Sequence, residues 1–185
     1  MEYFMRFGME ENPFLKNSRE ILFENPEFKE VQTRLNYLLT TKGFGVLTGG
    51  SGKGKTTSIR VWSRNLNTSM YKLIYSSLST LTVTEFYRTL ASGLGLEPRF
   101  RKSDNFKLIQ DEIRRFSLEK RITPVIIIDE ANNACNAILN DLKMIFNFEM
   151  DSRDRAVVLL SGLPSLKHTL QLGIHEQLRQ RITMT

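Results

Sequence analysis

The spacing of hydrophobic positions along the chain predicts helices and buried strands in alternation. One helix begins with Asn25 as N-cap and Pro26 as its first helical residue, and it ends at Lys42-Gly43. The capping box Thr82-x-x-Glu85 begins a later helix. Two further helices follow, and Pro124 is expected to stop the first of these. The inward faces of these helices are expected to carry Phe28, Val31, Leu35, Leu38 and Leu39; Val83, Phe86, Tyr87, Leu90 and Leu94; Phe106, Ile109, Ile113 and Phe116; and Leu139, Leu142, Ile145 and Phe146.

Short apolar runs between these helices predict strands. Val125–Ile128 and Ala156–Leu160 are apolar without alternation, which is typical of strands buried on both faces of a parallel sheet. Phe44–Thr48 and Leu73–Tyr75 predict two more buried strands, and a last strand begins at Ile182, after short helices from residue 165 to 180. Because strands and helices alternate, the predicted fold class is α/β, a three-layer α/β/α sandwich around a mainly parallel sheet.

The segment Gly49–Thr56 reads GGSGKGKT and fits G-x-x-x-x-G-K-[ST], the phosphate-binding P-loop. It lies between the strand Phe44–Thr48 and a helix predicted from Thr57 to Leu66, the layout in which backbone N–H groups and a helix N-terminus surround phosphate oxygens. Lys55 would bridge the β- and γ-phosphates, and the Thr56 hydroxyl would hold Mg²⁺. A glycine turn that happens to carry a lysine is the alternative, which the flanking elements disfavour. The expected nucleotide contacts are Gly49, Gly50, Ser51, Gly52, Lys53, Gly54, Lys55, Thr56 and Thr57.

Two acidic residues follow the strand Val125–Ile128, which is the Walker B pattern. Asp129 would lie near Thr56 and hold Mg²⁺, because the C-terminal ends of parallel strands line the ligand crevice. Glu130 would orient and polarise the attacking water. Ser161 ends the next strand, where it would reach the γ-phosphate or the water, or be an ordinary polar residue at a strand end.

Composition narrows the function classes only a little. The 185 residues suffice for one α/β domain, and no apolar run is long enough to span a bilayer. No secretory signal opens the chain, and the single cysteine, Cys135, excludes an internal disulfide. A reducing cytoplasm is therefore the expected location, with Cys135 as a small packing residue. The net charge of +6 is compatible with a polyanionic partner but does not require one.

Two groups of basic residues are candidate functional groups. Arg179 and Arg181 follow a helix, and either would act as an arginine finger across a subunit interface, with Arg181 preferred because it precedes Ile182; solvated cations are the alternative. A second cluster would grip a phosphate backbone without reading bases, or would be a solvated helix face interspersed with carboxylates. It comprises Arg99, Arg101, Lys102 and Lys107 around Phe100 and Phe106, followed by Arg114, Arg115, Lys120 and Arg121.

With these motifs, Ser161–Pro164 and Leu178–Ile182 in order, the chain resembles AAA+ ATPases over nearly its whole length. More narrowly, it resembles the bacterial group that includes transposition helper ATPases and general secretion pathway A-type (ExeA-like) ATPases. The stretches that carry this narrower resemblance are Phe7–Phe14, Leu78–Thr82 and Asn147–Arg153.

The resemblance implies a P-loop NTPase core over residues 26–185 after an aromatic lead segment, residues 1–25. It implies a five-stranded parallel sheet, ATP and Mg²⁺ as cofactors, and homo-oligomers with ATP between subunits. In the transposition branch, ATP drives assembly on double-stranded DNA, the assembly delivers target DNA to a transposase, and hydrolysis to ADP dissolves it.

The chain departs from the family pattern in three places. Leu163 stands where relatives often have a polar residue, and Asn132-Asn133 replaces a His-containing continuation of the acidic motif. The helical lid domain with a second sensor arginine is missing from residues 1–185, so weaker nucleotide binding and little self-assembly are expected.

Three functions remain open at this point. The leading hypothesis is an ATP-hydrolysing switch that assembles on DNA and assists transposition. The second is a secretion-associated ATPase with envelope proteins as partners, and the third is a module that binds nucleotide with negligible turnover. A metabolite kinase is disfavoured because no segment resembles a dedicated acceptor-binding region.

Overall fold

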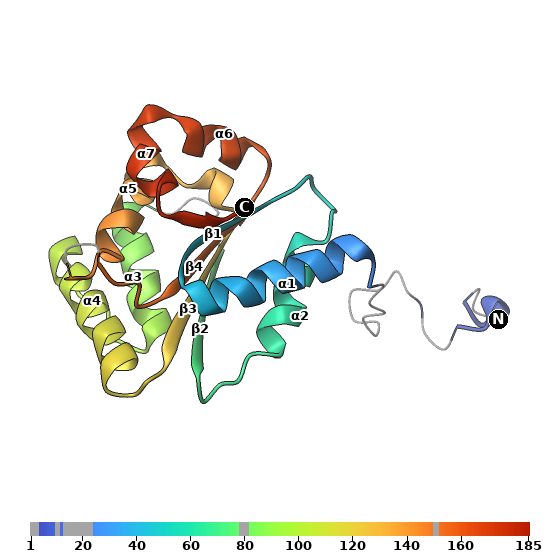
Figure 1. The fold of residues 1–185 in the computed structure, drawn as a ribbon, viewed down its shortest axis with the longest axis horizontal. Helices are drawn as coiled ribbons and strands as arrows, with labels where there is room; N and C mark the ends of the chain where they lie inside the picture. Colours follow the sequence, from blue (N-terminus) through green and yellow to red (C-terminus); the bar gives the residue numbers. More distant parts are fainter. Residues whose placement is uncertain (1–3, 10–11, 13–23, 78–81, 150–151) are drawn as a thin grey trace.

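The computed structural model describes residues 4–9, 12, 24–77, 82–149 and 152–185. Five strands form one sheet in the order β2-β3-β4-β1-β5, with every neighbouring pair parallel (Figure 1). The predicted three-layer α/β fold with a parallel five-stranded sheet is confirmed. The strands are β1 Gly43–Thr48, β2 Tyr71–Ser77, β3 Thr123–Asp129, β4 Val157–Gly162 and β5 Ile182–Met184.

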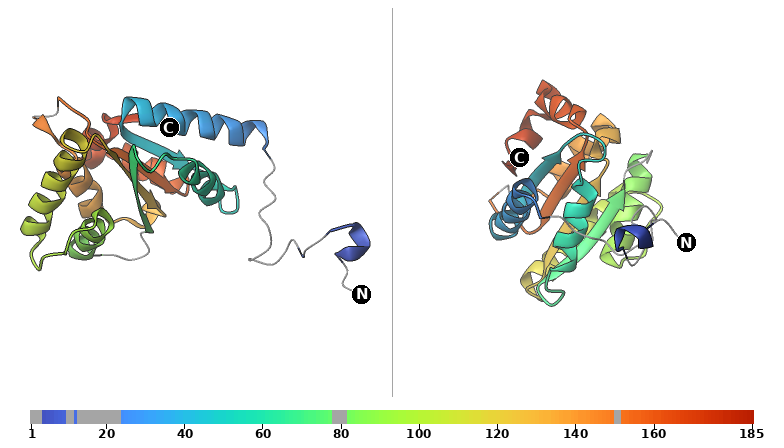
Figure 2. Two further views of the ribbon diagram at one scale, coloured as in Figure 1. Left: turned by 90° about the horizontal axis from the view of Figure 1, so that it is seen from below. Right: turned by 90° about the vertical axis from the view of Figure 1, so that its right-hand side faces the viewer.

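Helices cover both faces of this sheet. Figure 2 shows α1 and α2 on one side and α3 and α4 on the other. The helices are α1 Pro26–Thr41, α2 Lys55–Arg64, α3 Val83–Leu94, α4 Lys102–Leu118, α5 Asn136–Ile145, α6 Ser165–Gln171 and α7 Glu176–Arg179. Single turns of 3-10 helix are η1 Met5–Phe7, η2 Ala131–Asn133 and η4 Gly173–His175.

The central strand β3 contributes to two hydrophobic cores. Val125 and Ile127 join Trp62 and the inward residues of α1, while Ile126 and Ile128 join the residues of α3, α4 and α5 on the other face. Because successive side chains point to opposite faces and both faces are covered, this strand is apolar without alternation. The prediction that it is buried on both faces is confirmed.

Local signals also fixed where helices begin. Asn25 Oδ1 accepts the N–H of Phe28 at 2.7 Å, so the predicted N-cap of α1 is confirmed. Thr82 and Glu85 form both hydrogen bonds of the predicted capping box at the start of α3.

The prediction of a buried strand at Leu73–Tyr75 is wrong. β2 lies at the edge of the sheet, and the side chains of Leu73 and Tyr75 are 39% and 52% exposed. They lie on the same face as Val125 and Ile127, and only the opposite face of β2 carries the buried Ile74. An apolar run identifies a strand but does not give its place in the sheet.

Two other expectations are corrected by the structure. Pro124 does not stop a helix, because α4 ends at Leu118 and Pro124 lies in β3. The pairing of β3 with β4 begins at Val125, so proline, which has no N–H to donate, lies before that ladder. Cys135, expected as a packing residue, is exposed at the N-cap of α5.

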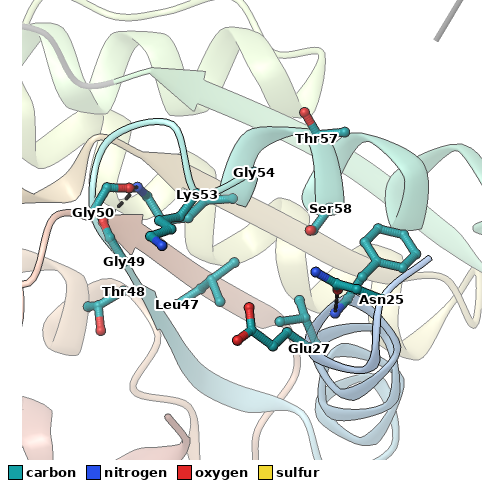
Figure 3. Close-up of a pocket in the computed structure, with 13 residues that line it drawn as sticks. Asn25, Glu27, Leu47, Thr48, Gly49, Gly50, Lys53, Gly54, Thr57 and Ser58 are labelled. Atoms are coloured by element: carbon teal, nitrogen blue, oxygen red, sulfur yellow. Dashed lines mark hydrogen bonds between the residues drawn. The ribbon is translucent and has the colours of Figure 1, made fainter. Parts of the chain in front are cut away.

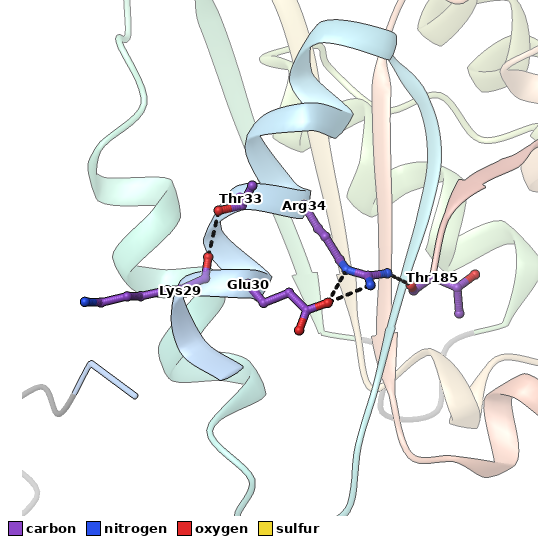
Figure 4. Close-up of polar contacts among 5 residues, drawn as sticks. All are labelled: Lys29, Glu30, Thr33, Arg34 and Thr185. Atoms are coloured by element: carbon purple, nitrogen blue, oxygen red, sulfur yellow. Dashed lines mark hydrogen bonds and ion pairs between the residues drawn. The ribbon is translucent and has the colours of Figure 1, made fainter. Parts of the chain in front are cut away.

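Helix α1 is joined to the edge strand β5. Arg34 donates from Nη1 to the carbonyl oxygen of Thr185 at 2.6 Å and pairs with Glu30 (Figure 4). These groups are exposed, so the packing of Leu38 against Met184 contributes more to holding α1 here.

Some expectations fall on residues that the structure does not describe. Residues 10–11, 13–23, 78–81 and 150–151 lie outside the described residues, and they include parts of all three stretches that carry the narrower family resemblance. Within the described residues, no helix combines the length and the apolar character needed to cross a membrane.

Candidate nucleotide-binding site

The P-loop connects the end of β1 to the start of α2. Gly52 and Gly54 have φ of +74° and +78°, and a Cβ at either position would meet no atom within 4 Å. The left-handed backbone, rather than lack of space, therefore requires glycine. The helix begins at Lys55, two residues before the predicted start at Thr57, so both Lys55 and Thr56 lie in its first turn. The N–H groups of this turn have no intrahelical acceptors and are directed out of the helix.

The Lys55 side chain folds back over the loop. Its Nζ donates to the carbonyl oxygens of Gly49 at 2.8 Å and Gly50 at 2.9 Å. These acceptors are neutral, and phosphate oxygens that replaced them would give stronger, charge-assisted hydrogen bonds.

Two hollows adjoin the P-loop, and Lys55 borders both. The larger, about 540 Å³, lies between the P-loop and the first turn of α1, with Glu27 on the α1 side and Leu47 beneath (Figure 3). Its volume suits a small-molecule ligand. It is lined by Asn25, Glu27, Phe28, Val31, Leu47, Thr48, Gly49, Gly50, Lys53, Gly54, Lys55, Thr57 and Ser58. The second hollow, about 380 Å³, is lined by Ser51, Gly52, Lys55, Thr56, Asp129, Glu130, Asn132, Asn133, Gly162 and Leu163.

Asp129 is the buried carboxylate of the second hollow. Its Oδ2 accepts the hydroxyl of Thr56 at 3.1 Å and that of Tyr75 at 3.0 Å, while its Oδ1 accepts the N–H of Glu130 at 3.0 Å. The fold thus brings together Thr56 and Asp129, which lie 73 positions apart in the sequence. Glu130 is exposed and has φ of +55°, an unfavourable conformation for a residue other than glycine, which it shares with Lys42, Arg121 and Glu149.

Tyr75 was not predicted as a site residue. Burial raises the pKa of its hydroxyl to about 12, and the negative charge of Asp129 adds to the effect. The hydroxyl therefore stays protonated at neutral pH and donates to Asp129. The apolar run around Tyr75 in the sequence indicates a strand, but it contains no signal that this strand lies beside Asp129.

The end of β4 closes the second hollow. Ser161 is fully buried, and its Oγ has no hydrogen-bond partner among the described residues. Asn132 Oδ1 accepts the N–H of Leu163 at 2.9 Å, which ties η2 to the end of β4. A Cβ at Gly162 would come within 2.7 Å of this Asn132 oxygen, so the close approach requires glycine. Asn132, noted in the sequence as a departure, therefore has a structural role.

The two candidate finger arginines lie outside both hollows. Arg179 is exposed on α7 and lines a separate cavity of about 180 Å³ with Val46 and Lys167. Arg181 donates from Nη1 to the carbonyl oxygen of Lys143 at 2.8 Å. Neither borders the P-loop of its own chain, and a role across a subunit interface stays a prediction.

The structure divides the predicted basic cluster. Lys102 pairs with Asp141 at 2.6 Å and lies 5.3 Å from the ring centre of Tyr87. Phe106 is partly buried and packs against the same ring, so it is not part of an exposed surface that could bind a phosphate backbone. Two other cations of α4 have partners on the same helix, where Arg114 pairs with Asp111 and Arg115 with Glu112. Lys120, two residues after the end of α4, lies over the ring of Phe116. The paired cations fit the interpretation as a solvated helix face. Arg99, Phe100 and Arg101 differ from them, because they are exposed on the connection between α3 and α4.

Comparisons with known proteins agree with this geometry. Residues 38–170 match the family model of the AAA domain. General secretion pathway protein A of Aeromonas hydrophila is 31% identical over 98% of this chain, and the chain spans 34% of that relative's length.

Solved structures similar to this chain include ORC and Cdc6 proteins. The ORC2 protein of Aeropyrum pernix, solved as ADPNP–ADP complexes, has a TM-score of 0.67 at 16% identity, and the match covers 92% of this chain and 49% of the ORC2 chain. The Cdc6p of Pyrobaculum aerophilum has a TM-score of 0.63 at 14% identity over 90% of this chain and 47% of its own. The ORC1 protein of A. pernix, solved in complex with DNA, has a TM-score of 0.57 at 20% identity over 82% of this chain and 42% of its own. At these identities the likeness shows a shared fold.

Proposed function

This chain belongs to the AAA domain family of P-loop ATPases, in the group that resembles General secretion pathway protein A, and on this premise we propose that it binds ATP with Mg²⁺ and hydrolyses it to ADP and phosphate. One observation carries the proposal. Thr56 Oγ1 lies 3.1 Å from Asp129 Oδ2, which joins the P-loop helix to the acidic end of β3 at one hollow.

The donor set at this point fits Mg²⁺. A hydroxyl and a carboxylate are hard oxygen ligands, and Mg²⁺ is commonly held by one or two such groups together with phosphates and water. Within the described residues no group of three or more His, Cys, Asp and Glu side chains is placed to hold a metal ion. Bound Mg²⁺ would supply neutralisation of phosphate charge.

Each site residue has a distinct proposed role. Residues 49–57 hold the phosphates through backbone N–H groups, and Lys55 exchanges its carbonyl acceptors for β- and γ-phosphate oxygens. Thr56 and Asp129 hold Mg²⁺, and Glu130 orients and polarises the attacking water. Ser161 lies near the end of the strand next to β3, and its Oγ has no partner among the described residues. It is fully buried and lines neither hollow, so its contact with the γ-phosphate or the water stays a prediction.

The test compares nucleotide binding and turnover in Glu130→Gln. We expect the Kd for ATP to stay within a few-fold while phosphate release falls about 10²- to 10⁴-fold, the usual contribution of a general base. Glu97→Gln, which changes another exposed glutamate, should leave both unchanged. If the folded parent binds neither ATP nor ADP at millimolar concentration, the nucleotide site is refuted. If it binds but does not hydrolyse, it is a nucleotide-dependent binding module.

A DNA-associated helper role in transposition is the finer proposal. The observation that favours it is the pair of exposed arginines, Arg99 and Arg101, on a chain of net charge +6. In this role the full-length protein would form homo-oligomers with ATP between subunits, Arg181 or Arg179 would reach the neighbour's site, and a transposase would be the partner.

Sizing of the full-length protein by light scattering, with and without ATP and duplex DNA, tests this role. Assembly that requires both supports it, whereas a particle of constant size contradicts it. A secretion-associated role, proposed from the name of the relative from A. hydrophila, predicts assembly without DNA.

A further inference from the structure

The connection between α3 and α4 presents an aromatic ring to solvent between two cations. Phe100 is 91% exposed, the highest value among the large apolar side chains that the structure describes. Arg99 and Arg101 are also exposed, and neither guanidinium has an ion pair or hydrogen bond within the described part of the chain. We call Arg99-Phe100-Arg101 the tip.

A buried amide holds the tip in one conformation. Asn105 is fully buried, and its Oδ1 accepts the N–H of Arg99 at 2.7 Å. Its Nδ2 donates to the carbonyl oxygens of Arg99 at 2.8 Å and Arg101 at 3.2 Å. All three bonds go to the tip backbone, so a partner that bound the tip would cost little conformational entropy.

The charges around the tip favour an anionic partner. Residues 97–107 contain four cations, Arg99, Arg101, Lys102 and Lys107, against two carboxylates, Glu97 and Asp104. Lys102 is paired with Asp141, so the positive charges next to the ring that have no ion-pair partner among the described residues are those of the two tip arginines. A flat apolar ring between two guanidinium forks matches a polymer that alternates flat bases with phosphates.

We propose that the tip binds nucleic acid, with the Phe100 ring stacked on an accessible base and Arg99 and Arg101 on the flanking phosphates. Every base has a face on which a ring can stack, so this contact is largely independent of sequence. The inference deepens the DNA-associated role proposed above, and it does not require nucleotide hydrolysis.

The experiment uses a single-stranded DNA oligonucleotide of mixed sequence that contains 2-aminopurine, whose emission changes when a ring stacks on it. Anisotropy of an end label gives affinity, in the absence of nucleotide. We expect Phe100→Ala to abolish the 2-aminopurine change and to weaken binding about 5- to 100-fold, the range for loss of one stacked base. Phe100→Trp should retain both signals.

The arginines are tested by the salt dependence of the same affinity. The double variant Arg99→Ala with Arg101→Ala should reduce the slope of log K against log salt by about 1.4, which corresponds to two lost phosphate contacts on a single strand. Leu118→Ala is the matched control for Phe100→Ala, because it also removes an exposed apolar side chain. Leu118 is 60% exposed and lies at the far end of α4 from the tip.

Three results would overturn the proposal: no binding to DNA by the parent, equal affinity and stacking signal in Phe100→Ala, or a salt slope unchanged in the double arginine variant. A protein partner of the tip would give the first of these results. ATP turnover, measured without DNA, is read separately, so failure at the tip and failure of the ATPase are distinguishable.

Discussion

The nucleotide site and the tip each contain a buried polar side chain that forms several hydrogen bonds. The two regions differ in whether their cations already have hydrogen-bond partners. At the nucleotide site Lys55 already donates to two carbonyls, and Asp129 already accepts three hydrogen bonds. At the tip, Asn105 bonds only to backbone, and Arg99 and Arg101 face solvent without partners in the described part of the chain.

The difference teaches which ligands each region can select. A ligand at the nucleotide site must replace hydrogen bonds that the protein makes to itself, so only a group with several strong acceptors, such as a polyphosphate, gains by binding. A ligand at the tip displaces water and counterions, so binding there should be less selective and more sensitive to salt.

The largest effect is expected for Lys55→Ala. Loss of charge-assisted hydrogen bonds to two phosphates should cost about 3 kcal/mol, or a 100-fold weaker Kd for ATP by calorimetry. Lys53→Ala changes an exposed lysine in the same loop and should alter the Kd less than about 5-fold. Equal losses in both variants would show that the loop attracts ATP by net charge rather than through Lys55.

A second effect is expected for Asn105→Ala on the other side of the comparison. Leaving the Arg99 N–H and two tip carbonyls without their partner should lower the free energy of unfolding by about 1 to 3 kcal/mol in urea titrations. Oligonucleotide binding should weaken as the tip loosens, with ATP binding unchanged. Ser103→Ala, a change at an exposed residue of the same helix, serves as control. Unaltered stability would show that the tip conformation does not depend on this amide.

A smaller effect is expected for Tyr75→Phe, which removes one of the donors to Asp129 Oδ2. In the proposed Mg²⁺ site this hydroxyl would compete with magnesium-bound water for the oxygen, so the Mg²⁺ concentration for half-maximal ATP binding should fall about 2- to 5-fold, consistent with a net gain near 1 kcal/mol. Tyr71→Phe on the same strand should have no effect. A higher Mg²⁺ requirement in Tyr75→Phe would mean that the hydroxyl orients the carboxylate instead.

The smallest effect concerns pH and lies outside both regions. Burial lowers the pKa of His175 below its usual 6.5, and the positive charge of Lys143 adds to this. Between the two pKa values the unfolded chain binds a proton that the folded chain does not, so stability falls as pH drops below about 6.5. Urea midpoints between pH 7 and pH 5 should therefore decline, with a flatter curve in His175→Gln.

The other histidine provides the control for this pH prediction. His168→Gln, at an exposed position, should keep the parent's pH dependence. If ATP and oligonucleotide binding weaken together at low pH in parallel with unfolding, the cause lies in the fold rather than in either site. Identical curves for parent and His175→Gln would exclude this histidine as the source.

The elements that could be predicted from the sequence are those whose signals are local. The P-loop, the acidic pair after β3, the Asn25 cap and the Thr82–Glu85 box each lie within a few residues, and backbone geometry links their members directly. Tyr75 and Asn132 could not be predicted as site residues, because their partners lie 54 and 31 positions away on other elements.

By itself the sequence determined the kind of each strand and helix, the α/β class and the phosphate-binding loop, since hydrophobic period, caps and glycines act over one or two turns. Only the tertiary structure decided that β2 is an edge strand, that Tyr75 reaches Asp129, and that Lys102 is paired whereas Arg99 and Arg101 have no partner among the described residues. Strand order and side-chain pairing depend on which elements are in contact in the folded protein, and the spacing of residues along the chain does not specify these contacts.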